Sequence, residues 1–283
     1  MGMKNVDYHL SGNIVLHIDK LDGKLKPKAE GTVDFDDQRS FELYIGSANV
    51  SLSAAALTDD LNHFVFAKPD APLKELSATT KGNELTVKGV LASKGGIGFE
   101  STGTLSVTPE GWIRVHTSKV KALHLPVKGL MDLLGLETAN LLSTKKITGV
   151  QADKEDLILD PELILPPPQL HGRLKSVRVE NGGVALSFGS AGSEEHPAGL
   201  SNSCGARNYI QFSGGSVRFG KLEMRETDLV LMDMQPADPF DFDIEHYKEQ
   251  LVAGYAKTTK KGGLCSHMPD YSKVKGHGQP KIR

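Results

Sequence analysis

Residues 84–123 read ELTVKGVLASKGGIGFESTGTLSVTPEGWIRVHTSKVKAL, and they carry the pattern that indicates the fold class. Apolar and polar residues alternate through it, which places the apolar side chains on one face of an extended strand. The breaks at 94–95 and 109–111 carry turn residues, so short connections join antiparallel neighbours. The pattern predicts three consecutive strands, over 84–91, 96–107 and 112–123.

The same alternation extends the meander in both directions along the chain. It predicts one strand over 8–18, which turns at Asp22-Gly23, and further strands at 40–53, 75–80, 147–151, 157–159, 174–179, 184–188, 209–213, 216–224 and 228–232. We therefore expect an α+β protein that is mostly β, with a long curved antiparallel meander sheet packed on a few amphipathic helices.

Three segments show the spacing of an amphipathic helix. The first covers 54–66 after a Ser53 cap, the second runs over 126–134, and the third covers 240–256 after Asp238-Pro239. Their apolar stripes are Leu57, Leu61, Phe64 and Val65; Leu130, Leu133 and Leu134; and Ile244, Tyr247, Leu251, Val252 and Tyr255.

Composition and charge exclude some classes of protein. Lys and Arg number 33 against 35 Asp and Glu, for a net charge of −2, and no run of four basic residues occurs. This excludes a polybasic nucleic-acid binder. No stretch of about 18 apolar residues is present, so no helix is expected to span a membrane. Residues 1–8 lack the apolar core of a signal peptide.

Motifs of catalysis and nucleotide binding are missing. The sequence contains no GxSxG elbow, Walker loop, HExxH or EF-hand series. The glycine clusters at 95–98 and 214–215 precede strands rather than helices, so they do not form phosphate cradles. We expect no cofactor and no enzymatic activity.

The densest group of acidic residues lies near the C-terminus and comprises Asp233, Asp238, Asp241, Asp243 and Glu245. Such a group supplies the oxygen ligands that Ca²⁺ prefers. Carboxylates in the first turn of a helix also stabilise its exposed N–H groups, and we favour this capping role. No metal site is therefore predicted.

Histidine and cysteine spacing does not indicate a metal site either. His9 and His17 would lie about 26 Å apart on one strand, and His116 and His124 have the same spacing. Cys265 and His267 form a C-x-H pair that nothing upstream completes as a zinc site. Cys204 and Cys265 both lie in Gly/Ser-rich segments, where a disulfide and two free thiols remain open alternatives.

Residues 120–136 read VKALHLPVKGLMDLLGL, and residues 163–186 contain LILPPP, then VRV, NGG and VAL. These two stretches resemble bacterial envelope proteins of the tubular lipid-binding (TULIP) type. The resemblance covers residues 40–190 and implies a curved sheet wrapped on a long helix, with an apolar groove for a lipid or other amphiphile. It implies no catalytic residues, a periplasmic or envelope location and transient membrane contact. The expected groove residues are Leu57, Leu61, Phe64, Leu130, Met131, Leu133, Leu134 and Leu136.

The sequence suggests four segments and three hypotheses of function. We expect a curved sheet with helices over 1–188, a flexible loop over 189–207, C-terminal strands and a helix over 208–260 that pack on the same body, and an extended tail over 261–283. Non-enzymatic binding or transport of a lipid or amphiphile is the leading hypothesis. The alternatives are a structural or interaction protein of the envelope and a glycan hydrolase that uses Asp233, Asp238 and Asp241.

Overall fold

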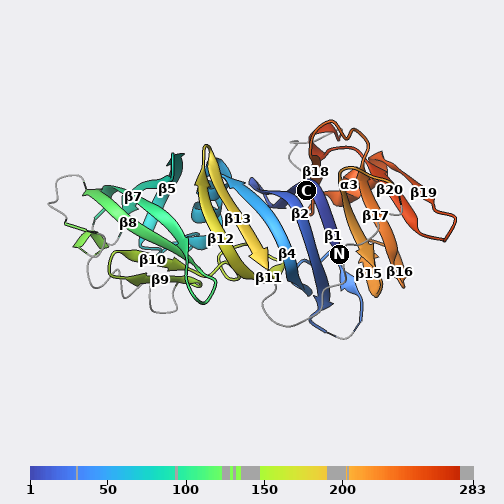
Figure 1. The fold of residues 1–283 in the computed structure, drawn as a ribbon, viewed down its shortest axis with the longest axis horizontal. Helices are drawn as coiled ribbons and strands as arrows, with labels where there is room; N and C mark the ends of the chain where they lie inside the picture. The colour runs from blue at the N-terminus through green and yellow to red at the C-terminus, as the bar shows by residue number, and fades with distance from the viewer. Residues whose placement is uncertain are drawn as a thin grey trace. The chain divides into compact units, whose positions relative to one another are not determined.

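The computed structural model describes residues 1–283 except 30, 93–94, 123–127, 130–131, 135–146, 190–201, 203 and 275–283. Large antiparallel sheets and a few short helices make up the fold (Figure 1), which confirms the predicted class of α+β, mostly β. None of the described helices is long and apolar enough to cross a membrane.

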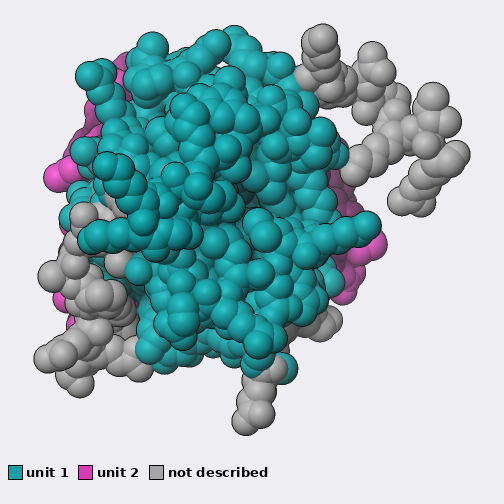
Figure 2. Space-filling view, turned by 90° about the vertical axis from the view of Figure 1, so that its right-hand side faces the viewer, with its two compact units in different colours: residues 1–50, 192–283 teal, residues 51–191 magenta. Residues whose placement is uncertain are grey.

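The chain forms two compact units whose boundaries differ from the expected ones. Unit 1 contains residues 1–50 and 192–283, and unit 2 contains residues 51–191 (Figure 2). The N-terminal strands therefore belong with the C-terminal part of the chain rather than with a body over 1–188. The reason is strand pairing across more than 200 residues, which a pattern of alternation does not reveal.

Unit 1 is built on one main sheet. Its strands lie in the order β4-β2-β1-β14-β17-β20-β19, and β18 pairs in parallel with β1 beyond the point where β14 ends. A small sheet has the order β16-β15-β3. The elements are β1 (Gly2–Ser11), β2 (Ile14–Pro27), β3 (Val33–Asp34), β4 (Phe41–Ser53, which continues into unit 2), β14 (Tyr209–Ser213), β15 (Ser216–Phe219), β16 (Leu222–Arg225), β17 (Asp228–Asp233), β18 (Phe240–Asp243), α3 (Tyr247–Ala253), β19 (Tyr255–Thr258), β20 (Leu264–Met268) and η3 (Tyr271–Lys273).

Several predictions in unit 1 are wrong. The single strand over 8–18 is a hairpin that turns at Gly12, where φ is +52°. The strand over 216–224 is the hairpin β15–β16. The expected tail over 261–283 contains β20, which lies between β17 and β19 in the sheet.

The third predicted helix is also wrong over its first half. Phe240 and Phe242 are fully buried on alternate positions of β18, which pairs with β1. The helix α3 begins only at Tyr247. Burying two phenylalanine rings beside β1 outweighs the capping signal of Asp238-Pro239, because each ring contributes roughly 2 to 3 kcal/mol.

Aromatic rings fill the core of unit 1. Phe35 stacks on Phe219 with ring centroids 4.4 Å apart, and it also contacts Phe41 and Phe212. Tyr247 of α3 packs edge-on against Phe219. Aromatic residues make up only 6% of the chain. Because several of them are concentrated in this core, their rings still fill it.

Unit 2 contains a six-stranded antiparallel sheet in the order β5-β6-β7-β8-β10-β9. The hairpin β12–β13 contacts this sheet through β5 and β7. The elements are α1 (Ala54–Asp60), the π-helix η1 (Leu61–Val65), β5 (Leu73–Lys81), β6 (Glu84–Leu91), β7 (Ile97–Val107), β8 (Ile113–Ala122), β9 (Val150–Asp153), β10 (Asp156–Leu159), β11 (Gln169–His171), β12 (Arg173–Glu180) and β13 (Gly183–Gly189).

The first predicted helix is confirmed, but it presents a different face to the core. Ser53 caps it, and its Oγ accepts a hydrogen bond from Ala56 N at 3.0 Å. The Thr58 and Asn62 side chains bond the backbone of β5, with Asn62 both donating to Leu76 O and accepting from Leu76 N. These bonds cover the edge of β5 and turn Asp60, rather than the apolar stripe, inward.

The second predicted helix lies mostly outside the described residues. Only residues 132–134 of its range are described as helical. Most of the expected loop over 189–207 also falls outside the described part of the chain.

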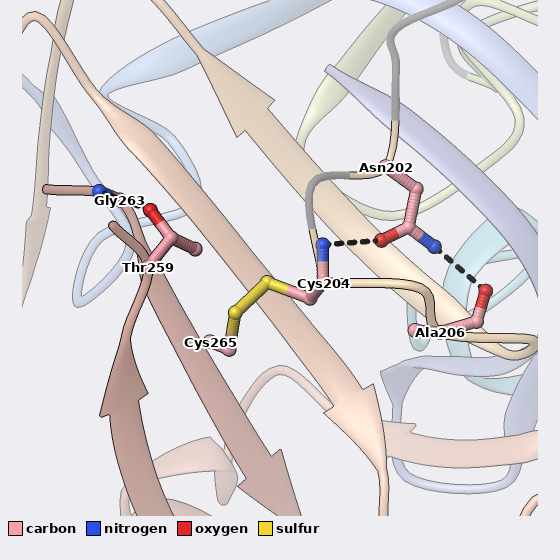
Figure 3. Close-up of a disulfide and its surroundings, with 6 residues drawn as sticks. All are labelled: Asn202, Cys204, Ala206, Thr259, Gly263 and Cys265. Carbon is pink, nitrogen blue, oxygen red and sulfur yellow. Dashed lines mark hydrogen bonds between the residues drawn. A yellow bond between two sulfur atoms is a disulfide. The ribbon is translucent and has the colours of Figure 1, made fainter. Parts of the chain in front are cut away.

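Cys204 and Cys265 form a disulfide, which resolves the alternative that the sequence left open (Figure 3). Cys265 lies on β20 and Cys204 precedes β14. Asn202 orders the chain around Cys204, because its amide accepts from Cys204 N and donates to Ala206 O. The disulfide therefore links β20 covalently to the segment that leads into β14.

Candidate ligand-binding site

The sheet of unit 2 has two chemically different faces. One face, here called the outer face, carries paired charges. Glu100 lies between Lys88 and Lys121, at 3.2 and 3.3 Å, and His116 Nδ1 lies 2.7 Å from Asp156 Oδ1. Thr86 and Thr102 share a hydroxyl hydrogen bond of 2.9 Å on the same face. Such side chains are those of a solvated sheet surface.

The opposite face, here called the inner face, is apolar. Strand register pairs Leu105 with Val115 and Val115 with Leu157, so one apolar row crosses β7, β8 and β10. A second row joins Val107 and Leu159 through Ile113. The apolar side chains of the inner face include Leu85, Val87, Phe99, Leu105, Val107, Ile113, Val115, Val120, Leu157 and Leu159.

Burial on the inner face is incomplete. Leu85 and Ile113 are buried, whereas Val87, Phe99, Leu105, Val107, Val115, Val120, Leu157 and Leu159 are only half-buried. The phenylalanines in the core of unit 1 are buried almost completely. An apolar sheet face normally packs against another layer, so an incompletely covered one is a candidate binding surface.

A hollow of about 600 Å³ lies at the end of this sheet. Phe99 and Ala122 belong to the inner face, whereas Lys88, Val90, Glu100 and Lys121 line the hollow from the outer face. Its volume falls within the range of small-molecule sites. An amphiphile has one apolar end and one polar or charged end, so a lining that is part apolar and part charged can contact both ends.

Gly89 lets the Phe99 ring lie across the inner face at this end of the sheet. A Cβ at position 89 would lie 2.5 Å from Leu76 Cδ2 and 3.1 Å from Phe99 Cε1. The space that a side chain would occupy is thus filled by Leu76 and Phe99. Any larger residue at position 89 would displace the ring from the face.

The groove residues expected from the sequence do not form one surface. Leu57 and Leu61 are half-buried, and Phe64 is 37% exposed. Leu133 and Leu134 are fully buried, as core residues are. Leu130, Met131 and Leu136 lie outside the described residues. The inner-face residues were missed as site residues, although their alternation along β7 and β8 predicted the strands that carry them.

The acidic residues near the C-terminus do not cap a helix, which corrects the sequence interpretation. Asp243 ends β18, and its Oδ1 accepts from Glu245 N and His246 N. Asp233 is buried and accepts from Asn208 Nδ2 and Gln235 N. Among the described residues, no group of three or more His, Cys, Asp or Glu side chains is arranged to hold a metal ion.

Asp270 joins this acidic group and was missed by the sequence analysis. It is buried, and its Oδ1 accepts a hydrogen bond from Asp241 N. Burial raises the pKa of Asp270 to about 6, and the nearby charges of Asp233, Asp238 and Asp241 act in the same direction. Because Asp233 and Asp270 are buried and bonded within the protein, this group offers a substrate few accessible carboxylates.

His9 and Asp241 form an ion pair between β1 and β18, with His9 Nε2 2.7 Å from Asp241 Oδ1. Burial lowers the pKa of His9, but the hydrogen bond and charge of Asp241, together with the charges of Asp243 and Asp7, outweigh it and leave that pKa raised. Burial raises the pKa of Asp241, but hydrogen bonds from His9 and Ser272 outweigh it and leave that pKa lowered.

We expect Asp241→Asn to destabilise the protein in a limited pH window. The raised pKa of His9 stabilises the fold below pH 6.5 and this contribution is lost as pH rises through the folded value. The lowered pKa of Asp241 stabilises it above pH 3.8 and is lost in acid. Urea titrations should therefore show a loss of about 1 to 2 kcal/mol between these pH values and a smaller loss at pH 9, where His9 is neutral and hydrogen bonds from Ser272 still favour the Asp241 carboxylate.

The pair His17–Asp7 gives the matched control. It has the same 2.7 Å separation, but its side chains are 38% and 37% exposed. His17→Gln should therefore cost less than about 1 kcal/mol at any pH. Equal losses for the two variants would contradict the role of burial at His9.

The other described histidines also pair within the chain. Carboxylates accept or approach the rings of His63, His116, His171 and His246, and His267 stacks on Tyr255. His9 and His17 lie on different strands, so the expected separation along one strand does not apply. No two of these described side chains form a shared metal site.

Comparison with protein-family models, curated proteins and solved structures finds no match to this chain. The residues and their geometry are therefore the evidence for a function. The inner face of unit 2 is the feature that this geometry singles out.

Proposed function

We propose that unit 2 binds the apolar part of a lipid or other amphiphile against the inner face of its sheet, without catalysis. The observation that carries the proposal is the row of half-buried apolar side chains across β6, β7, β8 and β10. Each methylene that leaves water on such a surface contributes about 0.8 kcal/mol. An acyl chain can therefore bind with no polar machinery.

The charged lining of the hollow supports an amphiphile rather than a plain hydrocarbon. Lys88, Glu100 and Lys121 lie beside Val90 and Phe99 at one end of the sheet. By strand register these three charged residues lie on the outer face, so the polar head of an acyl chain on the inner face would reach them only by extending past this end of the sheet. The TULIP resemblance over 40–190 points to the same class of ligand.

The disulfide supports the proposed location. Cys204–Cys265 requires an oxidising compartment to form and persist. The disulfide thus supports a proposed location in the periplasm or elsewhere in the cell envelope, where lipids and amphiphiles are also present.

The test fills the inner face without adding charge. If the inner face is uncovered as proposed, Val115→Trp should abolish binding of the fluorescent probe 1-N-phenylnaphthylamine while the free energy of unfolding changes by less than about 1 kcal/mol, because the indole would occupy the place of the ligand without overpacking a core. Lipid extraction and mass spectrometry of the purified wild type should recover a bound amphiphile. Probe titration and urea denaturation measure the two effects.

Ser106→Trp is the control, because Ser106 is exposed and pairs with Arg114 on the outer face. It should bind the probe as the wild type does. If the inner face is instead a closed core, Val115→Trp will overpack it and cost about 1 to 3 kcal/mol. That loss, or a wild type that yields no lipid and binds no probe, would overturn the proposal.

A further inference from the structure

The hairpin β19–β20 in unit 1 concentrates positive charge in a chain whose net charge is −2. Lys257 lies on β19, and Lys260 and Lys261 lie in the turn. No acidic residue occurs between Gly254 and Leu264. All three lysines are exposed, and none forms an ion pair with a described residue. The name basic hairpin is used here for residues 252–261, which run from the end of α3 through β19 into the turn.

Exposed apolar side chains accompany these lysines. Val252, at the end of α3, is 87% exposed, and Tyr255, at the start of β19, is 46% exposed. Lys257 Nζ lies 5.3 Å from the centre of the Tyr255 ring. Every residue of β19 is exposed. An exposed tyrosine and valine beside unpaired lysines is a combination that a purely solvated surface does not require.

The basic hairpin is held in a defined shape. Thr259 N donates to Gly263 O at 2.7 Å, and Gly263 N donates to Thr259 Oγ1 at 2.9 Å, and these bonds close the turn that contains Lys260 and Lys261. Figure 3 draws Thr259 and Gly263. The disulfide at Cys265 anchors β20 directly opposite Lys257. Ordering this surface on binding therefore costs little conformational entropy.

We propose that the basic hairpin docks on the surface of an anionic lipid bilayer. Its lysines would contact lipid phosphates, and the Tyr255 ring and Val252 would enter the headgroup region, where amphipathic rings are favoured. A lysine such as Lys257 also protects an exposed edge strand from aggregation. That role explains neither the two lysines of the turn nor the exposure of Val252.

The proposal is independent of the proposed function, because the basic hairpin belongs to unit 1 and the inner face to unit 2. The two can therefore fail separately. A variant of the basic hairpin should lose bilayer binding and still bind the fluorescent probe.

The experiment is co-sedimentation of the whole chain with vesicles. The wild type should bind vesicles of phosphatidylglycerol and phosphatidylcholine, bind vesicles of phosphatidylcholine alone weakly, and be released by salt. The variant K257Q/K260Q/K261Q should lower the partition coefficient about 100-fold. Val252→Ser with Tyr255→Ser should weaken binding further in salt, where the apolar contribution remains.

The matched control K4Q/K24Q/K221Q removes the same charge from exposed lysines elsewhere in unit 1. It should bind vesicles within a few-fold of the wild type. The proposal is overturned if this control loses as much binding as the hairpin variant, if neutral and anionic vesicles bind equally, or if the wild type binds neither. Capture of an acidic protein by the hairpin with no vesicle binding would also overturn it.

Discussion

Replacing Cys204 and Cys265 together with serine is expected to lower the free energy of unfolding by about 4 kcal/mol. The bond joins residues 61 positions apart, and without it the unfolded chain gains the entropy of that large loop. The enclosed segment includes β14, β17 and the first two residues of β20, and these three strands are consecutive neighbours in the sheet of unit 1. A loss of this size is a large fraction of the stability of an ordinary domain.

Urea denaturation of wild type and double variant, each with and without dithiothreitol, measures this effect. The reductant should destabilise the wild type and leave the double variant unchanged. A difference of less than about 1 kcal/mol would mean that the reduced, unfolded chain already restrains this loop. Sensitivity of the double variant to dithiothreitol would show that the reductant acts elsewhere.

The strands were predictable because their alternation is local. The ranges 40–53, 84–91 and 228–232 nearly match β4, β6 and β17. Their partners were not predictable, because alternation specifies a buried face and not the strand that lies beside it. The pairing of β1 with β14 and β18 joins opposite ends of the chain, and this explains why the expected boundary at 188–189 misplaced the N-terminal strands.

The misread start of α3 shows two local signals in conflict. Asp238-Pro239 is a strong helix start, whereas Phe240 and Phe242 alternate with Asp241 and Asp243 as in a strand. The partner strand β1 decided the outcome, and it lies more than 200 residues away. The local sequence pattern carries no information about the pairing of β18 with β1.

The sequence predicts the type of the candidate site, an apolar binding surface, but not the residues that form it. The pattern of 97–107 and 113–122 marks one apolar face, but a sequence does not show whether a second layer covers it. The sequence predicts that the apolar side of the first helix lines the groove, with Leu57, Leu61 and Phe64. Hydrogen bonds from Thr58 and Asn62 to β5 set the rotation of that helix instead.

The rotation of this helix also turns Asp60 inward. The second large prediction follows from this burial: replacing Asp60 with leucine will stabilise the protein at alkaline pH. Asp60 is 1% exposed, and its Oδ1 has no hydrogen-bond partner. Burial raises the pKa of Asp60 to about 7 from its ordinary value of 3.8. The folded state therefore holds a proton that the unfolded state releases, and stability falls as pH rises from about 4 to about 7.

At pH 8 the ionised carboxylate must be buried without a partner. Asp60→Leu should then raise the free energy of unfolding by on the order of 3 kcal/mol, and by much less at pH 4. Urea titrations of wild type and variant at several pH values give the two curves, which should converge in acid. Asp60→Asn removes the ionisation but keeps a polar group in the core, so it should flatten the pH dependence with a smaller gain.

Asp59 supplies the control, because it is the adjacent carboxylate and lies 3.7 Å from His63 on the accessible side of the helix. Asp59→Asn should change stability by less than about 1 kcal/mol and leave the pH dependence of the wild type intact. A wild type whose stability is constant between pH 4 and 8 would show that Asp60 has a partner for its charge. Since a buried carboxylate without such a partner costs stability, its presence at the junction of α1 and η1 makes this helix lose stability in base.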